Sequence, residues 1–448
     1  MARLTELPDE IIDNICSRLH SDRVEPNATR VGLHGLLLAS KKCNQIAIPH
    51  LYYSLSPTSV AAGLLALTVL KQPTFAAMVR IIDLEDYWLV RSTIDRAART
   101  TFLEEVGDLI AAPDVQVAER EDEDPPTTGE DLEDRRFHRR FTEFVLTRLP
   151  QLEVLALTLS EQLVDPATTN ALRHRSQNVL QNAKELEIRH SDTESGFEMS
   201  EIMPFLTGNN ITKVNLFACA GFGEATQICS SVKELRLDRT ALEPDEFEKL
   251  VHCFPNLEVL ALETADASVT EYMDDTPSAF KIGVDLGPLK DTLRSLTIDQ
   301  RERLDMDEDN DDGPYSKKPI GLLKTFNKLE ELVIWQFDLT RSHEDEKAAN
   351  PDGDEEEGED EEGLEDGFHK DEVKDGEGDQ LIPWAHKLPR SLQTLKIIGA
   401  TREIEPGLWR LSEIAGEEYP DLKKVVSCRR VKGLKAAFQK TGVEYRVD

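Results

Sequence analysis

The chain has 448 residues, a formal net charge of -34 at pH 7, and 39% hydrophobic residues. This length exceeds one compact core, so we expect several domains or one elongated repeat array. The charge predicts no nucleic-acid partner, because a polyanion is repelled unless basic residues are gathered in one patch. A basic protein is a more compatible partner.

The six cysteines are scattered and none is part of a Cys-x-x-Cys pair, so neither a disulfide framework nor a zinc site is predicted. The N-terminus is acidic where a signal peptide would be basic, and no apolar run approaches the roughly 18 residues of a membrane span. We therefore expect a cytoplasmic or nuclear protein with no membrane partner.

The N-terminal segment LTELPDEIIDNICSRL (4–19) predicts an amphipathic helix. Pro8 suits the first helical position, and Asp9 and Glu10 suit the positive end of the helix dipole. The apolar stripe comprises Ile11, Ile12, Ile15 and Leu19. A second apolar run, 33–55, predicts two more short helices, one before and one after Pro49. Three short helices make a core that is marginal alone and favours an additional packing partner.

After this module, short strand-like segments recur in a Leu-x-x-Leu-x-Leu form. Copies end at 84, 157, 188, 216, 237, 262, 298, 334, 397 and 427, and the last copy is degenerate. Such repetition is typical of a solenoid in which each copy buries its apolar face against its neighbours. Most intervals fall outside the roughly 20–29 residues of a leucine-rich repeat, so the array is expected to be irregular.

The longest interval separates Leu332 from Leu395 and contains the acidic tract 341–380. Without these residues, the interval has the length of an ordinary repeat. We therefore interpret the tract as a loop inserted into one repeat. Together with tracts 115–136 and 299–318 it holds -25 of the net charge of -34, and these insertions are expected to be disordered. They serve either as solubilising inserts or as docking sites for a basic partner.

Between strands, the segment 243–256 predicts a helix with Pro244 in its first turn and an apolar stripe at helical spacing. The leucine-rich pattern also expects Asn or Cys three residues after the last Leu of each strand, and only Cys219 fits it. The turns must therefore differ from one repeat to the next.

No catalytic motif is found in the sequence. Phosphate-binding Gly-rich loops, His-Glu-x-x-His and Gly-x-Ser-x-Gly are absent, and the ten histidines are dispersed. The acidic run 305–318 does not form a calcium loop, because Pro319 occupies the position of the essential glutamate. We expect no enzyme, no metal and no cofactor.

Residues 4–55 resemble an F-box motif of the fungal type. The resemblance rests on Leu7-Pro8-Asp9-Glu10-Ile11-Ile12, on Leu37-Leu38-Ala39-Ser40-Lys41, and on Ile48-Pro49-His50-Leu51-Tyr52. The following segment, 57–84, resembles the helix and Pro-containing turn that precede the first leucine-rich strand in such proteins. Two features depart from the motif: residues 20–35 are longer than the usual link and are expected to loop out, and Cys43 replaces a common bulky aromatic residue.

The resemblance implies an α/β protein with an F-box at 1–55 and a leucine-rich-repeat-like solenoid at 57–448. It implies a substrate-recognition subunit of an SCF-type E3 ubiquitin ligase, which binds the SCF adaptor and, through it, cullin, while the repeats select a target protein. The residues implied in adaptor binding are Leu7, Pro8, Ile11, Ile12, Ile15, Leu37, Ser40, Lys41, Leu51 and Tyr52. Some of these must instead fill the F-box core.

For target binding, the outward strand residues are the candidates: Glu234, Arg236, Glu258, Ala261, Glu331 and Val333. Two alternatives remain open. The chain is either an F-box scaffold with a non-degradative assembly role, or a leucine-rich interaction protein with no link to ubiquitin, whose N-terminal helices cap the solenoid.

Overall fold

The computed structural model describes 18 segments or single positions: residues 6–21, 26–55, 62–84, 93–106, 137, 141, 144, 148–159, 180–190, 196–206, 210–224, 227–264, 277, 279–300, 320, 323–339, 384–400 and 402–448. The chain divides into two compact units, Met1–Thr276 and Pro277–Asp448. The acidic tracts 115–136 and 341–380 lie outside the described residues, as does 299–318 apart from its first two residues.

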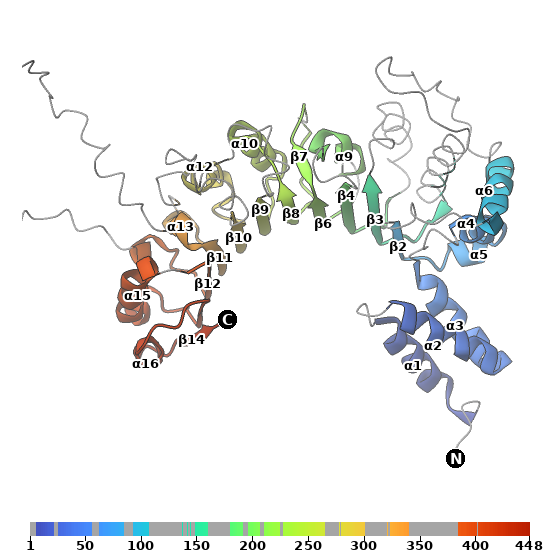
Figure 1. Ribbon diagram of the computed structural model, residues 1–448, viewed down its shortest axis with the longest axis horizontal. Coiled ribbons are helices and arrows are strands. Elements are labelled where there is room, and N and C mark those ends of the chain that lie inside the picture. The colour runs from blue at the N-terminus through green and yellow to red at the C-terminus, as the bar shows by residue number, and fades with distance from the viewer. Residues whose placement is uncertain are drawn as a thin grey trace, which may run out of the picture. The chain divides into compact units, whose positions relative to one another are not determined.

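The first unit begins with three helices and continues with parallel strands (Figure 1). Its helices are α1 (Asp9–Ser21), α2 (Pro26–Ala39), α3 (Lys41–Tyr53), α4 (Ala62–Lys71), α5 (Pro73–Ala76), α6 (Thr93–Val106), α9 (Met199–Leu206) and α10 (Pro244–Cys253). Its strands are β1 (Ser54–Leu55), β2 (Ile81–Leu84), β3 (Val154–Leu159), β4 (Glu185–His190), β5 (Phe197–Glu198), β6 (Lys213–Phe217), β7 (Cys219–Gly221), β8 (Glu234–Thr240) and β9 (Val259–Thr264).

The second unit repeats the alternation of helix and strand. Its helices are α12 (Ala279–Asp285), α13 (Gln336–Leu339), α15 (Glu405–Glu418) and α16 (Leu434–Lys440), with short 3₁₀ turns η2 (Gly287–Leu289), η4 (Leu323–Thr325), η5 (Trp384–Lys387) and η6 (Arg402–Ile404). Its strands are β10 (Ser295–Asp299), β11 (Glu331–Trp335), β12 (Thr394–Ile398), β13 (Lys424–Ser427) and β14 (Glu444–Val447).

The strands of the first unit pair in parallel in the order β1-β2-β3-β4-β6-β8-β9, and β5 pairs in parallel with β7. The middle apolar residue of each repeat lies in register with the next. This buried row comprises Ile82, Leu155, Leu186, Val214, Leu235 and Leu260. Alternate side chains of a strand share one face, so this row forms the inner core and the intervening residues face outward. The predicted leucine-rich-repeat-like α/β fold is confirmed.

In the second unit the parallel order is β10-β11-β12-β13-β14, and the buried row comprises Leu296, Leu332, Leu395, Val425 and Tyr445. Leu332 pairs directly with Leu395 although 341–380 lies between them in sequence. The two strands are therefore neighbours, as the interpretation of the tract as an insertion within one repeat requires. The sequence pattern missed β14, because its one buried apolar residue, Tyr445, does not make a Leu-rich motif.

The helix predicted at 243–256 is α10, which begins at Pro244. Glu243 and Glu246 form a capping box, and Phe247, Leu250 and Val251 are fully buried. Figure 1 shows α9 and α10 on one side of strands β4 to β9. Cys219, which alone fits the leucine-rich pattern, is buried with its thiol donating to the Gly221 carbonyl at 3.3 Å.

Three local expectations about the N-terminal helices were wrong. Residues 26–35 do not loop out, because Pro26 begins α2 and places Leu33, Leu36 and Leu37 on one stripe. The helix break lies at Ser40 instead of Pro49, which stays inside α3 with its ring exposed. Finally, α1 begins at Asp9, and Pro8 precedes it.

Candidate docking surface of the N-terminal helices

The core of the N-terminal helices is small and completely buried. It consists of Ile12 and Cys16 from α1, Leu33 from α2, and Cys43 and Ala47 from α3, all 2% exposed or less. Partly buried apolar residues pack around it: Leu7, Leu19, Leu36, Leu37, Ile46 and Leu51. Cys43 therefore lies within this core, where its small side chain is closely packed against the neighbouring residues.

Polar contacts join the ends of these helices. The Lys42 ammonium donates to the Leu7 carbonyl at 2.7 Å and pairs with Asp9 at 2.7 Å. The Asn44 amide donates to the Leu37 carbonyl at 3.2 Å. These contacts tie α3 to the start of α1 and to the end of α2, so both junctions hold a defined position.

Ser40 has a structural role at the start of α3. Its backbone is extended, and its hydroxyl accepts a hydrogen bond from the Cys43 amide at 3.0 Å. This is an N-cap, which typically contributes about 1 kcal/mol to helix stability. The Ser-Lys pair of the motif thus begins a helix with Ser40 and presents Lys41 to solvent.

The structure divides the ten residues implied in adaptor binding into groups. Ile12 is completely buried, Leu7, Leu37 and Leu51 pack partly buried against the core, Ser40 caps α3, and Tyr52 stacks on Phe75. Pro8, Ile11 and Lys41 are exposed, and Ile15 is half-buried. Of the ten, Pro8, Ile11 and Lys41 are therefore the residues with exposed side chains.

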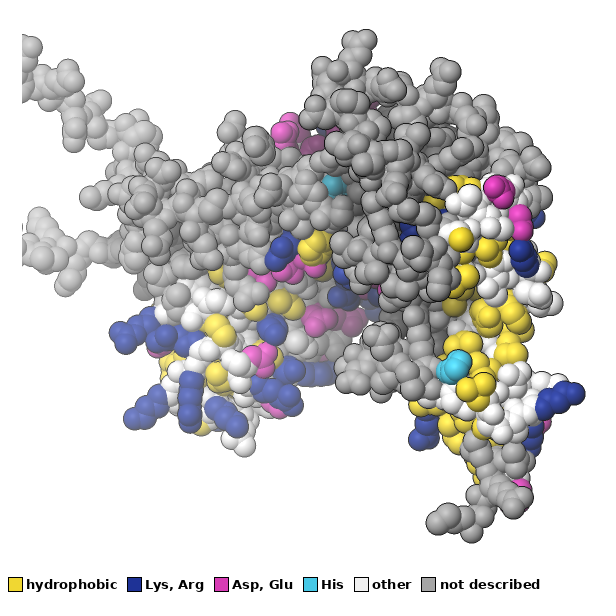
Figure 2. Space-filling view, turned by 45° about the vertical axis from the view of Figure 1, so that its right-hand side comes forward, with side chains coloured by type: hydrophobic (Ala, Val, Ile, Leu, Met, Phe, Trp, Pro, Cys, Tyr) yellow, Lys and Arg dark blue, Asp and Glu magenta, His cyan; other side chains and the backbone are white. Residues whose placement is uncertain are grey.

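Among the residues of the N-terminal helices whose side chains are described, two large apolar ones are exposed to solvent. Ile11 on α1 is 48% exposed, and Leu38 on α2 is 75% exposed. Figure 2 shows hydrophobic side chains on the surface over the N-terminal helices. The helices leave these two residues outside their own core although the core is small. Together with Pro8, Ile15 and Lys41 they define the candidate docking surface.

In the sequence, Leu38 belongs to the apolar run 33–55 together with its neighbours Leu36 and Leu37. Once α2 is known to run from Pro26 to Ala39, helical spacing separates Leu38 from the stripe formed by Leu33 and Leu37. A helix start at Pro26 would have predicted the exposure of Leu38. The sequence pattern missed this start, because residues 20–35 were interpreted as a loop.

Burial raises the pKa of the Cys16 thiol, with Asp13 as the second cause, and burial also raises the pKa of the Tyr52 hydroxyl. A thiol in this state is not a nucleophile at neutral pH. Among the described residues, no group of three or more His, Cys, Asp or Glu side chains could hold a metal ion. No described helix is long and apolar enough to span a membrane.

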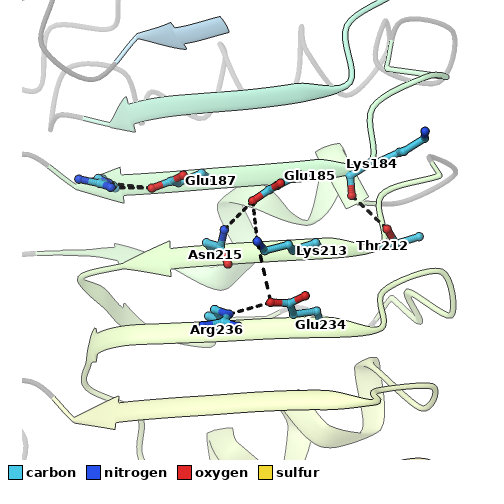
Figure 3. A network of polar contacts seen from close by, with 9 residues as sticks. Lys184, Glu185, Glu187, Thr212, Lys213, Asn215, Glu234 and Arg236 are labelled. Atoms are coloured by element: carbon cyan, nitrogen blue, oxygen red, sulfur yellow. Dashed lines mark hydrogen bonds and ion pairs between the residues drawn. The ribbon is translucent and has the colours of Figure 1, made fainter. Parts of the chain in front are cut away.

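A second candidate surface, which is polar, lies on the outward strand residues of the first unit (Figure 3). Glu185 accepts from Lys213 at 2.9 Å and from Asn215 at 3.1 Å across β4 and β6. On β8, Arg236 donates to Glu234 at 2.7 Å. The charges on this face are therefore paired within and between neighbouring strands, which leaves a polar surface with little net charge.

Of the six target-binding candidates, Glu234, Arg236 and Ala261 lie in these outward rows of the first unit. Glu331 and Val333 lie in the corresponding rows of the second unit. Glu258 does not, because it precedes β9 and its carboxylate pairs with Lys233 at 2.7 Å. The pattern placed Glu258 wrongly since it lies before the first residue of the strand.

Comparisons with known proteins do not assign this chain to a family. No protein-family model matches it. No curated protein matches it either. Among solved structures, the chain is similar to one in the crystal structure of the Rad7 and Elc1 complex in yeast, with 10% identity over 88% of this chain and 90% of that chain, at a TM-score of 0.34. A likeness at this TM-score says nothing about the partners of the present chain.

Proposed function

We propose that this protein is the substrate-recognition subunit of an SCF-type E3 ubiquitin ligase. In this proposal the N-terminal helices dock onto the SCF adaptor, which bridges to cullin, and the repeats hold a target protein. The observation that supports it best is the exposure of Ile11 and Leu38 on a module whose own core is small. Fully burying an aliphatic side chain of this size is worth about 1.5–3 kcal/mol, so covering Leu38 and the exposed part of Ile11 would contribute to docking.

The protein itself would perform no chemistry. It would act by proximity, because holding a target beside the ubiquitin-charged enzyme raises the effective concentration of the target lysine. This role requires only two binding surfaces on a scaffold that holds them. The exposed residues of α1 and α2 provide the first, and the outward strand residues provide the second.

The adaptor test compares two variants of the full chain purified from its own cells. Ile11→Glu combined with Leu38→Glu places charges on the docking surface while leaving Ile12 and the buried core intact. Ile228→Glu is the matched control, because Ile228 is 68% exposed in the repeat region. We expect adaptor and cullin to be lost from the double variant and retained by the control, with unchanged thermal melting in both.

Each outcome of this purification has a distinct meaning. Retention of the adaptor by the double variant contradicts the assignment of this surface. Adaptor without cullin on the wild-type chain replaces the ligase role with a non-degradative assembly role. Absence of both from the wild-type chain identifies a leucine-rich interaction protein without a link to ubiquitin.

For the target, we propose the outward strand face around Lys213 and Arg236. Reversing a charge there, as in Arg236→Glu, puts a carboxylate beside Glu234, with which Arg236 now pairs. Since this pair is partly exposed, the expected loss of stability is below about 1 kcal/mol. We expect the variant to lose one or more co-purifying proteins while it keeps the adaptor. An unchanged set of partners would place target binding elsewhere.

A further inference from the structure

The last repeat is basic, although the chain as a whole is acidic. Between Lys423 and Val443 there are seven Lys and Arg residues and no Asp or Glu, in a protein of net charge -34. The seven are Lys423, Lys424, Arg429, Arg430, Lys432, Lys435 and Lys440. Figure 2 shows Lys and Arg side chains gathered over this part of the second unit.

Most of these cations have no carboxylate partner. Arg429 pairs with Glu405 at 2.8 Å, and Lys423 donates to the neutral Gln393 at 2.7 Å. Within the part of the chain that the structure describes, the remaining five form no ion pair within 4.0 Å: Lys424, Arg430, Lys432, Lys435 and Lys440. The repeats of the first unit differ, since Lys213 and Lys233 there each bind a glutamate.

The carboxylate nearest in sequence to this segment is already engaged. Glu444 accepts from Arg446 at 2.7 Å, and this hydrogen bond, helped by Lys424 and Lys435, lowers the pKa of Glu444. The last repeat therefore keeps an uncompensated positive charge.

Helix stability accounts for Lys440, which lies in the last turn of α16, but not for Lys435. The helix α16 begins after Gly433, which has a φ of +86°, and its first turn contains Lys435 and no acidic residue. The positive end of the helix dipole disfavours a cation at this place. Exposed like charges on one small repeat also repel each other. A bound anionic partner would relieve this repulsion.

An exposed aromatic ring borders the same loop. Trp409 on α15 is 39% exposed, and a Cβ added at Gly433 would lie 3.3 Å from its Cη2 atom. The indole edge thus lies against the loop that carries Arg430 and Lys432 before Lys435 begins α16. A partly exposed tryptophan next to cations offers apolar contact beside charge pairing, a combination enriched at binding hot spots.

We propose that the surface formed by Arg430, Lys432, Lys435 and Trp409 binds a short acidic peptide segment that carries an apolar residue. The cations pair with its carboxylates, and the indole packs on its apolar side chain. A short peptide is favoured over nucleic acid, because the rest of this acidic chain repels a polyanion that extends beyond the surface. The proposal is independent of the ligase role.

The test measures binding of a labelled peptide to the full chain by fluorescence anisotropy. The peptide has about four Asp and Glu residues around one Leu, and its control has Asn and Gln instead. We expect the acidic peptide to bind at low salt and weaken as salt rises. The variant R430Q/K432Q/K435Q should bind about tenfold more weakly, whereas K249Q/K290Q/K328Q, with the same loss of charge at exposed sites elsewhere, should bind like wild type.

A second readout isolates the tryptophan. Peptide binding should change the intrinsic fluorescence of the wild-type chain, and Trp409→Phe should abolish this change while keeping salt-dependent binding. Equal affinity of wild type and R430Q/K432Q/K435Q overturns the proposal, as does the absence of any peptide binding at low salt. Tighter binding of a single-stranded oligonucleotide at the same salt would overturn it in favour of a nucleic-acid site.

Discussion

The ring of Tyr52 stacks on the ring of Phe75, with centroids 4.3 Å apart and planes inclined by 18°. Tyr52 lies in the last turn of α3, and Phe75 lies in α5, which leads into β2. Directly after α3, Ser54 pairs with Ile81 of the first repeat strand. The helix that follows the Ser-Lys pair is thus joined to the solenoid by an aromatic contact and by strand pairing.

Tyr52 is therefore expected to act on stability and not on adaptor binding. Tyr52→Ala should lower the free energy of unfolding by about 1–2 kcal/mol, because an aromatic pair is worth about 0.5–1.5 kcal/mol beyond its buried area. Tyr52→Phe keeps the ring and should melt like wild type. Thermal unfolding by circular dichroism checks both. Normal melting of Tyr52→Ala together with loss of the adaptor would contradict this assignment.

The cysteines should differ sharply in reactivity. Cys428 is exposed, whereas Cys16, Cys43, Cys219, Cys229 and Cys253 are buried, and burial raises the pKa of Cys219 to about 12. A thiol reagent should modify one cysteine quickly in the native protein and all six after denaturation. Cys428→Ser should abolish the fast reaction. Fast modification of a second cysteine would show that one of the buried sites opens readily.

Glu201 should make stability depend on pH. Burial raises its pKa to about 7, and its Oε2 atom is buried without a hydrogen-bond partner among the described residues. The folded state keeps this proton while the unfolded chain releases it near its ordinary pKa of 4.5. The contribution of Glu201 to the free energy of unfolding is therefore fully present below pH 4.5 and is lost as the pH rises through about 7.

Glu201→Gln removes the ionisation and keeps a side-chain oxygen. In the wild-type chain, this oxygen of Glu201 accepts a hydrogen bond from the Glu198 backbone amide at 3.4 Å. The variant should melt higher than wild type at pH 8 and close to it at pH 5. Glu417→Gln, on the exposed face of α15, is the control and should shift little at either pH. Equal effects of Glu201→Gln at both pH values would refute a role for this ionisation.

The acidic tract 341–380 lies outside the described residues, and its role stays a prediction. Since β11 and β12 pair directly around it, its deletion should leave the repeats folded. If the tract recruits a basic target, the deletion should weaken association at low salt and have less effect at high salt. Equal target recovery at low salt with and without the tract would leave it a solubilising role only.

The sequence by itself predicted most of the repeat strands and their buried face, because a two-residue alternation of leucines fixes which face of a strand is buried. Leu332 and Leu395 pair as their motifs require, although an acidic tract separates them. It also predicted α10, whose start at Pro244 and apolar spacing are local features.

Only the tertiary structure divided the N-terminal motif into core and surface. Ile11 and Ile12 are adjacent and chemically identical, yet one is 48% exposed and the other completely buried. Which of them faces inward depends on where α2 and α3 pack, and those helices have bounds that the motif did not reveal. The unpaired cations of the last repeat were likewise visible only once their neighbours were placed. Charge composition counts residues along the chain, whereas pairing depends on distances between them.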